Sequence, residues 1–141
     1  KRTIQNMLSA VLLNLFKCGL CLGMGSGVQP FPWVHIDDVV GICLQAMESP
    51  NMQGIYNVVS PGIVSNTEFT KRLAERLGKT VLGRIPGWLI KAVVGSERST
   101  ILLLGQRVKP TRTQASGYSF KFSQLDDCLE DLLAQEQGAR T

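Results

Sequence analysis

The sequence has few aromatic residues and no long hydrophobic run, and each shortage argues against a class of function. Aromatic residues make up 6% of the chain and are not interleaved with the basic residues, which argues against nucleic-acid binding. No stretch reaches the ~18 uninterrupted apolar residues that a membrane span needs. We therefore expect a soluble protein that binds neither nucleic acid nor a membrane.

The sequence also lacks two motifs on which dinucleotide-dependent chemistry relies. A dinucleotide fingerprint needs a Gly-rich turn between a strand and a helix, so that backbone N–H groups reach the pyrophosphate. The four glycines between residues 19 and 27 do not have that spacing, and prolines follow where the helix would begin. A Tyr-x-x-x-Lys pair is absent, because Lys121 follows Tyr118 by three residues and Tyr56 has no lysine nearby. We assign no catalytic and no cofactor-binding residue to this chain.

Four cysteines and a single histidine are too few for an evident metal site. Cys18 and Cys21 have C-x-x-C spacing, which suits zinc or a reactive dithiol only with a second ligand pair or a thioredoxin-like context. Neither is evident, because Cys43 and Cys128 fall on apolar helix faces and His35 is the only histidine. We expect no metal, buried free thiols, and a reducing, intracellular compartment.

Length and composition indicate a chain with one sizeable core. Of its 141 residues, 44% are hydrophobic and only 18% are charged, which favours buried or partner-covered faces. The apolar run at residues 7–16 follows Lys1-Arg2 as a signal-peptide core would. Polar residues interrupt this run and no small-residue cleavage site follows, so we do not expect a targeting role.

The most informative segment runs from Pro30 to Asp38 and joins a loop rich in Gly and Pro to a short apolar strand. Asp37 or Asp38 is predicted to cap the next helix by accepting hydrogen bonds from its first backbone N–H groups. Residues 39–48 are almost entirely apolar and predict a buried helix, which stops at Ser49-Pro50-Asn51.

Further elements follow from local signals. Ser65-Asn66-Thr67-Glu68 is a capping box that opens a helix with Gly78 as its left-handed cap. The remaining predicted elements are a strand at 80–85, a helix opened by Pro86, a helix at 98–104, a strand at 119–122 and a final helix with an apolar stripe from Leu125 to Leu133.

Three groups of residues resemble one protein superfamily. Trp33-Val34-His35-Ile36-Asp37-Asp38 is similar to a segment of the extended and atypical short-chain dehydrogenase/reductases. Residues 54–61, followed by Asn66-Thr67-Glu68-Phe69, resemble the strand and helix that come next in that superfamily. Gly105-Gln106-Arg107-Val108-x-Pro110-x-Arg112 and Gly117-Tyr118-x-Phe120-x-Phe122 resemble the C-terminal, DUF1731-type domain of its epimerase family proteins. The resemblance covers residues 19–134.

This resemblance implies an α/β fold, with the C-terminal part of a Rossmann-like, doubly wound fold and a small α/β substrate-side domain. We predict a remnant of the NAD(P)-binding and substrate-loop region at 1–60, a substrate-side helical domain at 61–134 and a frayed tail at 135–141. The family keeps its nicotinamide fingerprint and catalytic residues in an N-terminal half that this chain lacks. The chain alone is therefore expected to bind neither NADP nor NAD and to be inactive.

The full-length protein would, by the same resemblance, move a hydride between the nicotinamide and a hydroxyl or carbonyl carbon of a small-molecule substrate. A parallel sheet needs both faces covered, so the strands around Val34 and Tyr56 would expose apolar edges in this chain alone. We expect the chain alone to be unstable or to need a partner. The substrate and the oligomeric state are left open.

Seven residues are candidates for the substrate side. An irregular segment with bulky aromatic residues, at the mouth of an α/β cleft, is where small-molecule pockets form. Core packing is an equal alternative for Gln29, Phe31 and Trp33, and a histidine in an apolar strand is more often structural. The candidates are Gln29, Phe31, Trp33, His35, Arg107, Lys109 and Arg112.

Positive charge is concentrated in one segment. Residues 71–121 carry eleven of the fifteen Lys and Arg but only two acids, a net +9 where the whole chain is +4. Two interpretations stay open: solvated helix faces paired in part with the acidic last helix, and a pocket for an anionic substrate. A third, nucleic-acid binding, is disfavoured because few aromatic residues are interleaved with these charges. As an alternative function, a truncated isoform would act without catalysis by docking this basic surface onto an acidic partner.

Overall fold

The computed structural model describes residues 21–138, and the chain divides into two compact units. Of the described residues, the first unit holds 21–29 together with Ser65–Leu104. The second holds Pro30–Val64 together with 105–138. The three-part division expected from sequence, with a boundary after residue 60, stays a prediction. The apolar run at 7–16 and Cys18 lie outside the described residues.

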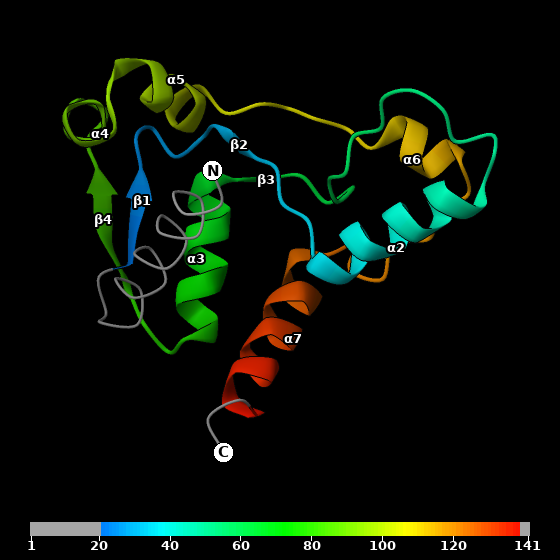
Figure 1. Ribbon diagram of the computed structural model, residues 1–141. Helices are drawn as coiled ribbons and strands as arrows, with labels where there is room; N and C mark the ends of the chain where they lie inside the picture. Colours follow the sequence, from blue (N-terminus) through cyan, green and yellow to red (C-terminus); the bar gives the residue numbers. More distant parts are fainter. Residues whose placement is uncertain (1–20, 139–141) are drawn as a thin grey trace. The chain divides into compact units, whose positions relative to one another are not determined.

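A parallel strand pair with one helix beside it makes up much of the first unit (Figure 1). Met24 lies opposite Ile85 in the register, and an irregularity follows Cys21. Leu73 and Ala74 of the helix are buried. The elements are β1 (Cys21–Met24), α3 (Asn66–Arg76), β4 (Val81–Ile85), α4 (Gly87–Val94) and α5 (Ser96–Leu104).

Local signals predicted α3 well. Oγ of Ser65 accepts a hydrogen bond of 3.1 Å from the backbone N–H of Glu68, which confirms the capping box. Gly78 has φ of 64°, the left-handed conformation predicted for it after the helix. The strand at 80–85 and the two helices after it also form where they were predicted.

Three helices and long irregular segments build the second unit. Its elements are β2 (Pro30–Phe31), α2 (Ile36–Glu48), β3 (Val64–Ser65), of which only Val64 belongs to this unit, α6 (Thr111–Ala115) and α7 (Leu125–Gly138). β2 and β3 form a second two-stranded sheet. The buried apolar residues of the second unit are Trp33, Ile42, Val64, Leu125, Cys128 and Leu129. Among residues 21–138, no helix is long and apolar enough to cross a membrane.

Three predicted strands are wrong. The segments around Val34 and Tyr56 and the segment 119–122 are irregular, and none belongs to either sheet of the described chain. Polar side chains take up several of their backbone groups instead. Oγ1 of Thr113, for example, donates to the carbonyl of Asn57 at 2.9 Å. These bonds satisfy backbone groups that a strand would place in a ladder.

The predicted cap of α2 is also wrong. His35 occupies the N-cap position, where its Nδ1 accepts a hydrogen bond of 3.2 Å from the backbone N–H of Asp37. Asp37 itself is exposed in the first turn, where its charge suits the positive end of the helix. Asp38 turns inward and is fully buried.

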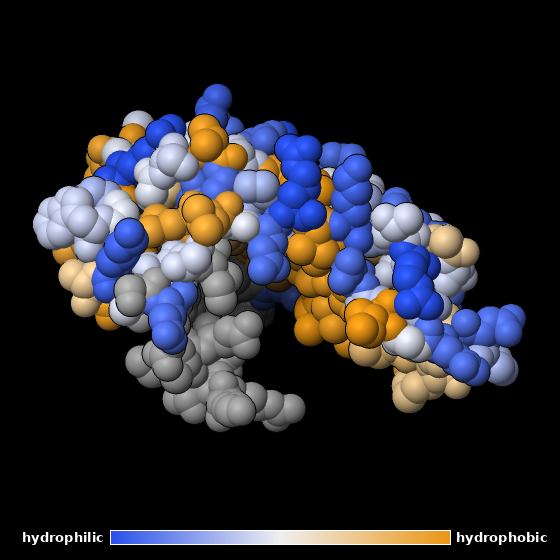
Figure 2. Space-filling model, turned by 90° about the horizontal axis from the view of Figure 1, so that it is seen from above, coloured by the Kyte–Doolittle hydropathy of each residue, from blue (hydrophilic) through white to orange (hydrophobic). Residues whose placement is uncertain are grey.

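One face of α2 is exposed, although the helix was predicted to be buried. The exposed face, named here the α2 stripe, comprises Ile36 (59% exposed), Val40 (51%), Leu44 (49%) and Met47 (75%). Spacings of four, four and three residues place these side chains along one side of the helix. Figure 2 shows hydrophobic side chains at the surface among hydrophilic ones.

The three cysteines of the described chain differ in exposure. Cys21 and Cys128 are buried, as predicted, whereas Cys43 is exposed, contrary to the prediction. Cys43 lies seven residues after Ile36 and therefore falls on the α2 stripe. A thiol thus marks this apolar face of the helix.

Candidate functional site

Asp38 joins α2 to the segment that precedes α7. Its Oδ1 accepts hydrogen bonds from the Tyr118 hydroxyl at 3.0 Å and from the Lys121 backbone N–H at 2.8 Å. Its Oδ2 accepts from the Phe122 backbone N–H at 3.0 Å. One buried carboxylate thereby satisfies two backbone donors of the segment 119–122, which explains why that segment needs no neighbouring strand.

Tyr118 also explains a glycine inside α2. A Cβ at Gly41 would collide with the Tyr118 hydroxyl, so only glycine lets the ring reach Asp38. Burial raises the pKa of Tyr118 to about 12, and the hydrogen bond to Asp38 and the nearby carboxylate charges add to this. Burial likewise raises the pKa of the Cys128 thiol, to about 11, with smaller contributions from the charges of Asp131 and Asp38.

These shifts predict a loss of stability at alkaline pH. Between the ordinary tyrosine pKa of 10.0 and about 12, the folded chain holds the Tyr118 proton while the unfolded chain releases it. The free energy of unfolding should therefore fall as pH rises through this range. Tyr118→Phe should reduce this decline, and it is made in a Cys128→Ala background because the raised pKa of Cys128 contributes in the same direction. Urea unfolding between pH 9 and pH 12 measures the free energy of unfolding. If Tyr118→Phe leaves its pH dependence unchanged, Tyr118 is not the group responsible.

His35 is packed within the second unit. Its side chain is buried, and its ring centroid lies 4.0 Å from that of Phe122. Nε2 lies 3.2 Å from Oδ2 of Asp131 but forms no hydrogen bond with it. With Nδ1 engaged at the start of α2, the ring links α2 to α7.

The candidates near the start of the sequence are also held by internal contacts. Trp33 is buried, and its Nε1 donates to the carbonyl of Gly62 at 2.5 Å. Gln29 is buried in the first unit, where its Nε2 donates to the carbonyl of Met24 at 2.8 Å. Phe31 is half-buried. These aromatic and amide groups contribute to packing in two different units.

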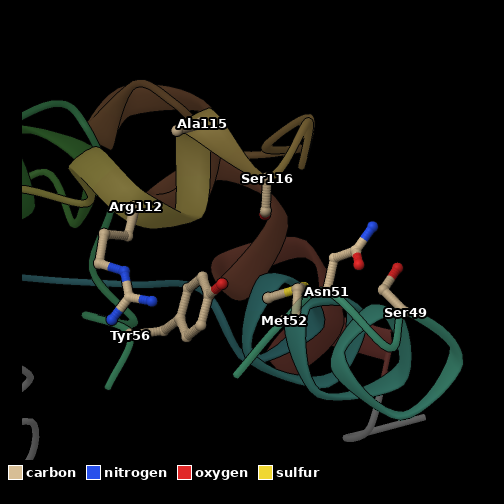
Figure 3. Close-up of a pocket in the computed structure, with 7 residues that line it drawn as sticks. All are labelled: Ser49, Asn51, Met52, Tyr56, Arg112, Ala115 and Ser116. Atoms are coloured by element: carbon tan, nitrogen blue, oxygen red, sulfur yellow. The ribbon is translucent and has the colours of Figure 1, made fainter. Parts of the chain in front are cut away.

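A pocket of about 390 Å³ lies between α6 and the segment after α2 (Figure 3). Arg112 is the one residue of the seven candidates that lines it. The segment Ser49-Pro50-Asn51 was predicted only as a helix stop, and nothing in the sequence indicated that it forms a pocket wall. The lining residues are Ser49, Asn51, Met52, Tyr56, Arg112, Ala115 and Ser116.

Arg112 is held by neutral groups. Its Nη1 donates to the carbonyl of Ile55 and its Nη2 to the carbonyl of Gln53, both at 2.8 Å. The guanidinium carbon lies 4.6 Å from the centre of the Tyr56 ring, a cation–π arrangement. Among the described residues, no carboxylate pairs with Arg112.

Arg107 and Lys109 are exposed and do not line this pocket. The backbone carbonyl of Lys109 accepts a hydrogen bond of 3.2 Å from Nδ2 of Asn57. The motif from Gly105 to Arg112 therefore contributes one side chain to the pocket.

The Gly-rich loop after β1 does not fit a dinucleotide. The side chains of Thr67 and Arg84 occupy the space beside Gly27, where a pyrophosphate would have to approach the backbone. The N–H groups of Asn66 and Thr67 at the start of α3 donate to loop carbonyls, at 3.0 Å and 2.8 Å. A strand also follows this loop where a fingerprint has a helix.

The basic segment 71–121 is divided between the two units, with residues 71–104 in the first and 105–121 in the second. Lys71 pairs with Glu75, and Arg72 with Glu68, along α3. Nζ of Lys121 lies 3.9 Å from Oδ2 of Asp37. In the described part of the chain, no group of three or more His, Cys, Asp or Glu side chains could hold a metal.

Comparison with known proteins finds relatives over most of the chain. A domain of unknown function, DUF1731, matches residues 85–132. Human epimerase family protein SDR39U1 is 40% identical over 123 residues, which cover 87% of this chain and 42% of the human protein. The SDR39U1 homolog of Arabidopsis thaliana, named chloroplastic, is 33% identical and is matched over 88% of this chain and 35% of its own length.

A solved structure shares the fold. The crystal structure of human epimerase family protein SDR39U1 (isoform 2) with NADPH has a TM-score of 0.83 and 38% identity. The match covers 86% of this chain and 41% of the human chain. The mixed α/β fold with a parallel strand pair is thus confirmed, and so is the predicted resemblance. The chain spans about two fifths of the length of the human relative.

Proposed function

We propose that this chain, a relative of the epimerase family proteins, forms the substrate side of an NAD(P)-dependent oxidoreductase or epimerase-like enzyme. Its human relative has been solved with NADPH, which supports NADPH as the cofactor of the complete protein. The cofactor would exchange a hydride with a hydroxyl or carbonyl carbon of a small molecule. This chain would not bind the cofactor by itself, because its Gly-rich loop is filled by its own side chains.

The observation that carries the proposal is the exposed α2 stripe. A helix that is apolar on nearly all sides is usually buried, yet four large side chains of α2 are about half exposed or more. The human relative has more than twice the length that this chain matches. We therefore propose that the α2 stripe packs against the cofactor-binding portion of the complete protein.

Cys43 on the α2 stripe gives a direct test. The full chain is mixed with the portion of human SDR39U1 that it does not match, and labelling of Cys43 by N-ethylmaleimide is followed by mass spectrometry. In the chain alone Cys43 should react readily, because its side chain is exposed. In the mixture its labelling should slow by about tenfold or more, because docking excludes solvent, and NADPH fluorescence should change only in the mixture.

A matched pair of variants locates the contact. Leu44→Lys places a charge on the α2 stripe and should abolish protection of Cys43, because burying an unpaired charge is costly. Ala46 is also exposed on α2, but it lies two residues after Leu44 and therefore on another side of the helix. Ala46→Lys should leave the protection of Cys43 intact. Equal labelling of Cys43 with and without the human portion, or NADPH binding by the chain alone, would overturn the proposal.

A further inference from the structure

We propose that the pocket between α6 and the segment after α2 binds a small oxyanion through Arg112. This site is separate from the α2 stripe, and all seven of its lining residues belong to the second unit. The inference does not depend on the proposed enzymatic function.

The charge of the pocket is the first argument. Arg112 is its only charged lining residue, and no acidic side chain lines it. Among the residues that the structure describes, no carboxylate neutralises this guanidinium. A positive charge in a concave site attracts anions, and arginine matches the geometry of carboxylate and phosphate oxygens.

The position of the guanidinium is the second argument. The carbonyls of Gln53 and Ile55 and the ring of Tyr56 hold it in place. A guanidinium has five N–H donors, so three remain after these two hydrogen bonds. Because the group is already fixed, little side-chain entropy is lost when an anion binds.

The other lining groups suit the same ligand. Figure 3 shows the Tyr56 ring beside the Arg112 guanidinium, with its hydroxyl directed toward Met52 and Ser116. The hydroxyls and the amide of Tyr56, Ser49 and Asn51 can donate to oxygens of an anion. Met52 and Ala115 provide apolar contact for a short carbon chain. A volume of about 390 Å³ is at the small end of ligand pockets, which favours a compact ligand.

The test uses the full chain with malonate and inorganic phosphate, and sodium chloride at matched ionic strength as the control. Saturable changes in the ¹⁵N chemical shift of Arg112 Nε should occur with malonate or phosphate and not with chloride. Tighter binding of malonate would identify a carboxylate ligand, and tighter binding of phosphate a phosphorylated one. Absence of saturable binding by both would overturn the proposal.

Variants separate the pocket from general basic charge. Asn51→Asp adds a negative charge to the pocket without changing a contact of Arg112, and should weaken anion binding by about tenfold or more. Arg112→Gln should weaken anion binding by a similar factor, measured as the rise in melting temperature that malonate or phosphate causes. Arg107→Gln removes an exposed charge that does not line the pocket and should change binding by less than about twofold. Equal losses from Arg107→Gln and Asn51→Asp would overturn the proposal.

Discussion

Replacing Asp38 with alanine is expected to lower the free energy of unfolding of the second unit by about 3–5 kcal/mol. The carboxylate is fully buried and accepts hydrogen bonds from Tyr118, Lys121 and Phe122. Its removal leaves three donors without an acceptor, and each unsatisfied buried donor costs about 1–3 kcal/mol. Urea unfolding followed by Trp33 fluorescence, with Trp88 replaced by phenylalanine, measures the loss.

Asp37→Ala provides the matched control. Asp37 is the neighbouring acid, but its side chain is exposed and its contact with Lys121 is 3.9 Å long. An exposed ion pair of this kind is worth about 1 kcal/mol or less. If Asp37→Ala and Asp38→Ala destabilise the chain equally, the inward carboxylate does not hold the segment before α7 in the way the structure indicates.

Gly62→Ala is expected to lower the free energy of unfolding by about 2–3 kcal/mol. A Cβ at Gly62 would lie 2.5 Å from the carbonyl oxygen of Ser123, which is a backbone atom and cannot rotate away. The Gly62 carbonyl also accepts the hydrogen bond of the Trp33 indole. The substitution should therefore shift the Trp33 fluorescence spectrum as well as the urea midpoint.

Gly87→Ala provides the matched control for Gly62→Ala. Gly87 begins α4, and a Cβ there would meet Leu103 at 3.4 Å, an ordinary van der Waals distance. Gly87→Ala should be neutral or slightly stabilising, because alanine favours a helix more than glycine does. A Gly62→Ala variant as stable as the Gly87→Ala variant would show that the contact with Ser123 adapts without cost.

The elements that the sequence predicted correctly are those whose signals are local. The capping box at Ser65 and the left-handed Gly78 each depend on a few neighbouring residues. Pro86 sets the start of α4 in the same way. Such signals need no knowledge of what lies opposite the segment, so they identify α3 and α4 without the tertiary structure.

The elements that were wrong depend on distant residues. The segment 119–122 alternates like a strand, but Asp38, about eighty positions earlier, takes up its N–H groups. The cap of α2 was assigned to the wrong residue for a related reason, because Asp38 is drawn inward by Tyr118. A strand pattern shows which side chains are apolar and not which backbone group will be the hydrogen-bond partner.

The candidate pocket was predictable only in part. The sequence singled out Arg112 as a candidate for an anion pocket, and Arg112 lines a pocket in the structure. That this pocket binds an anion stays a proposal. Ser49 and Tyr56 form other walls because Arg112 binds the carbonyls between them, and no spacing in the sequence indicates that contact. The α2 stripe gave no signal either, because exposed and buried apolar residues are alike in a sequence.

The segment Ser65–Leu104 is an insertion within the second unit, because the chain leaves that unit after Val64 and returns to it at Gly105. The closure entropy of such an insertion grows slowly, by only about 0.6 kcal/mol for each doubling of its length. The second unit should therefore tolerate changes in the length of the inserted segment far better than substitutions at Asp38 or Gly62. Its two halves meet through side chains, so a break within the insertion would leave them associated without a covalent link.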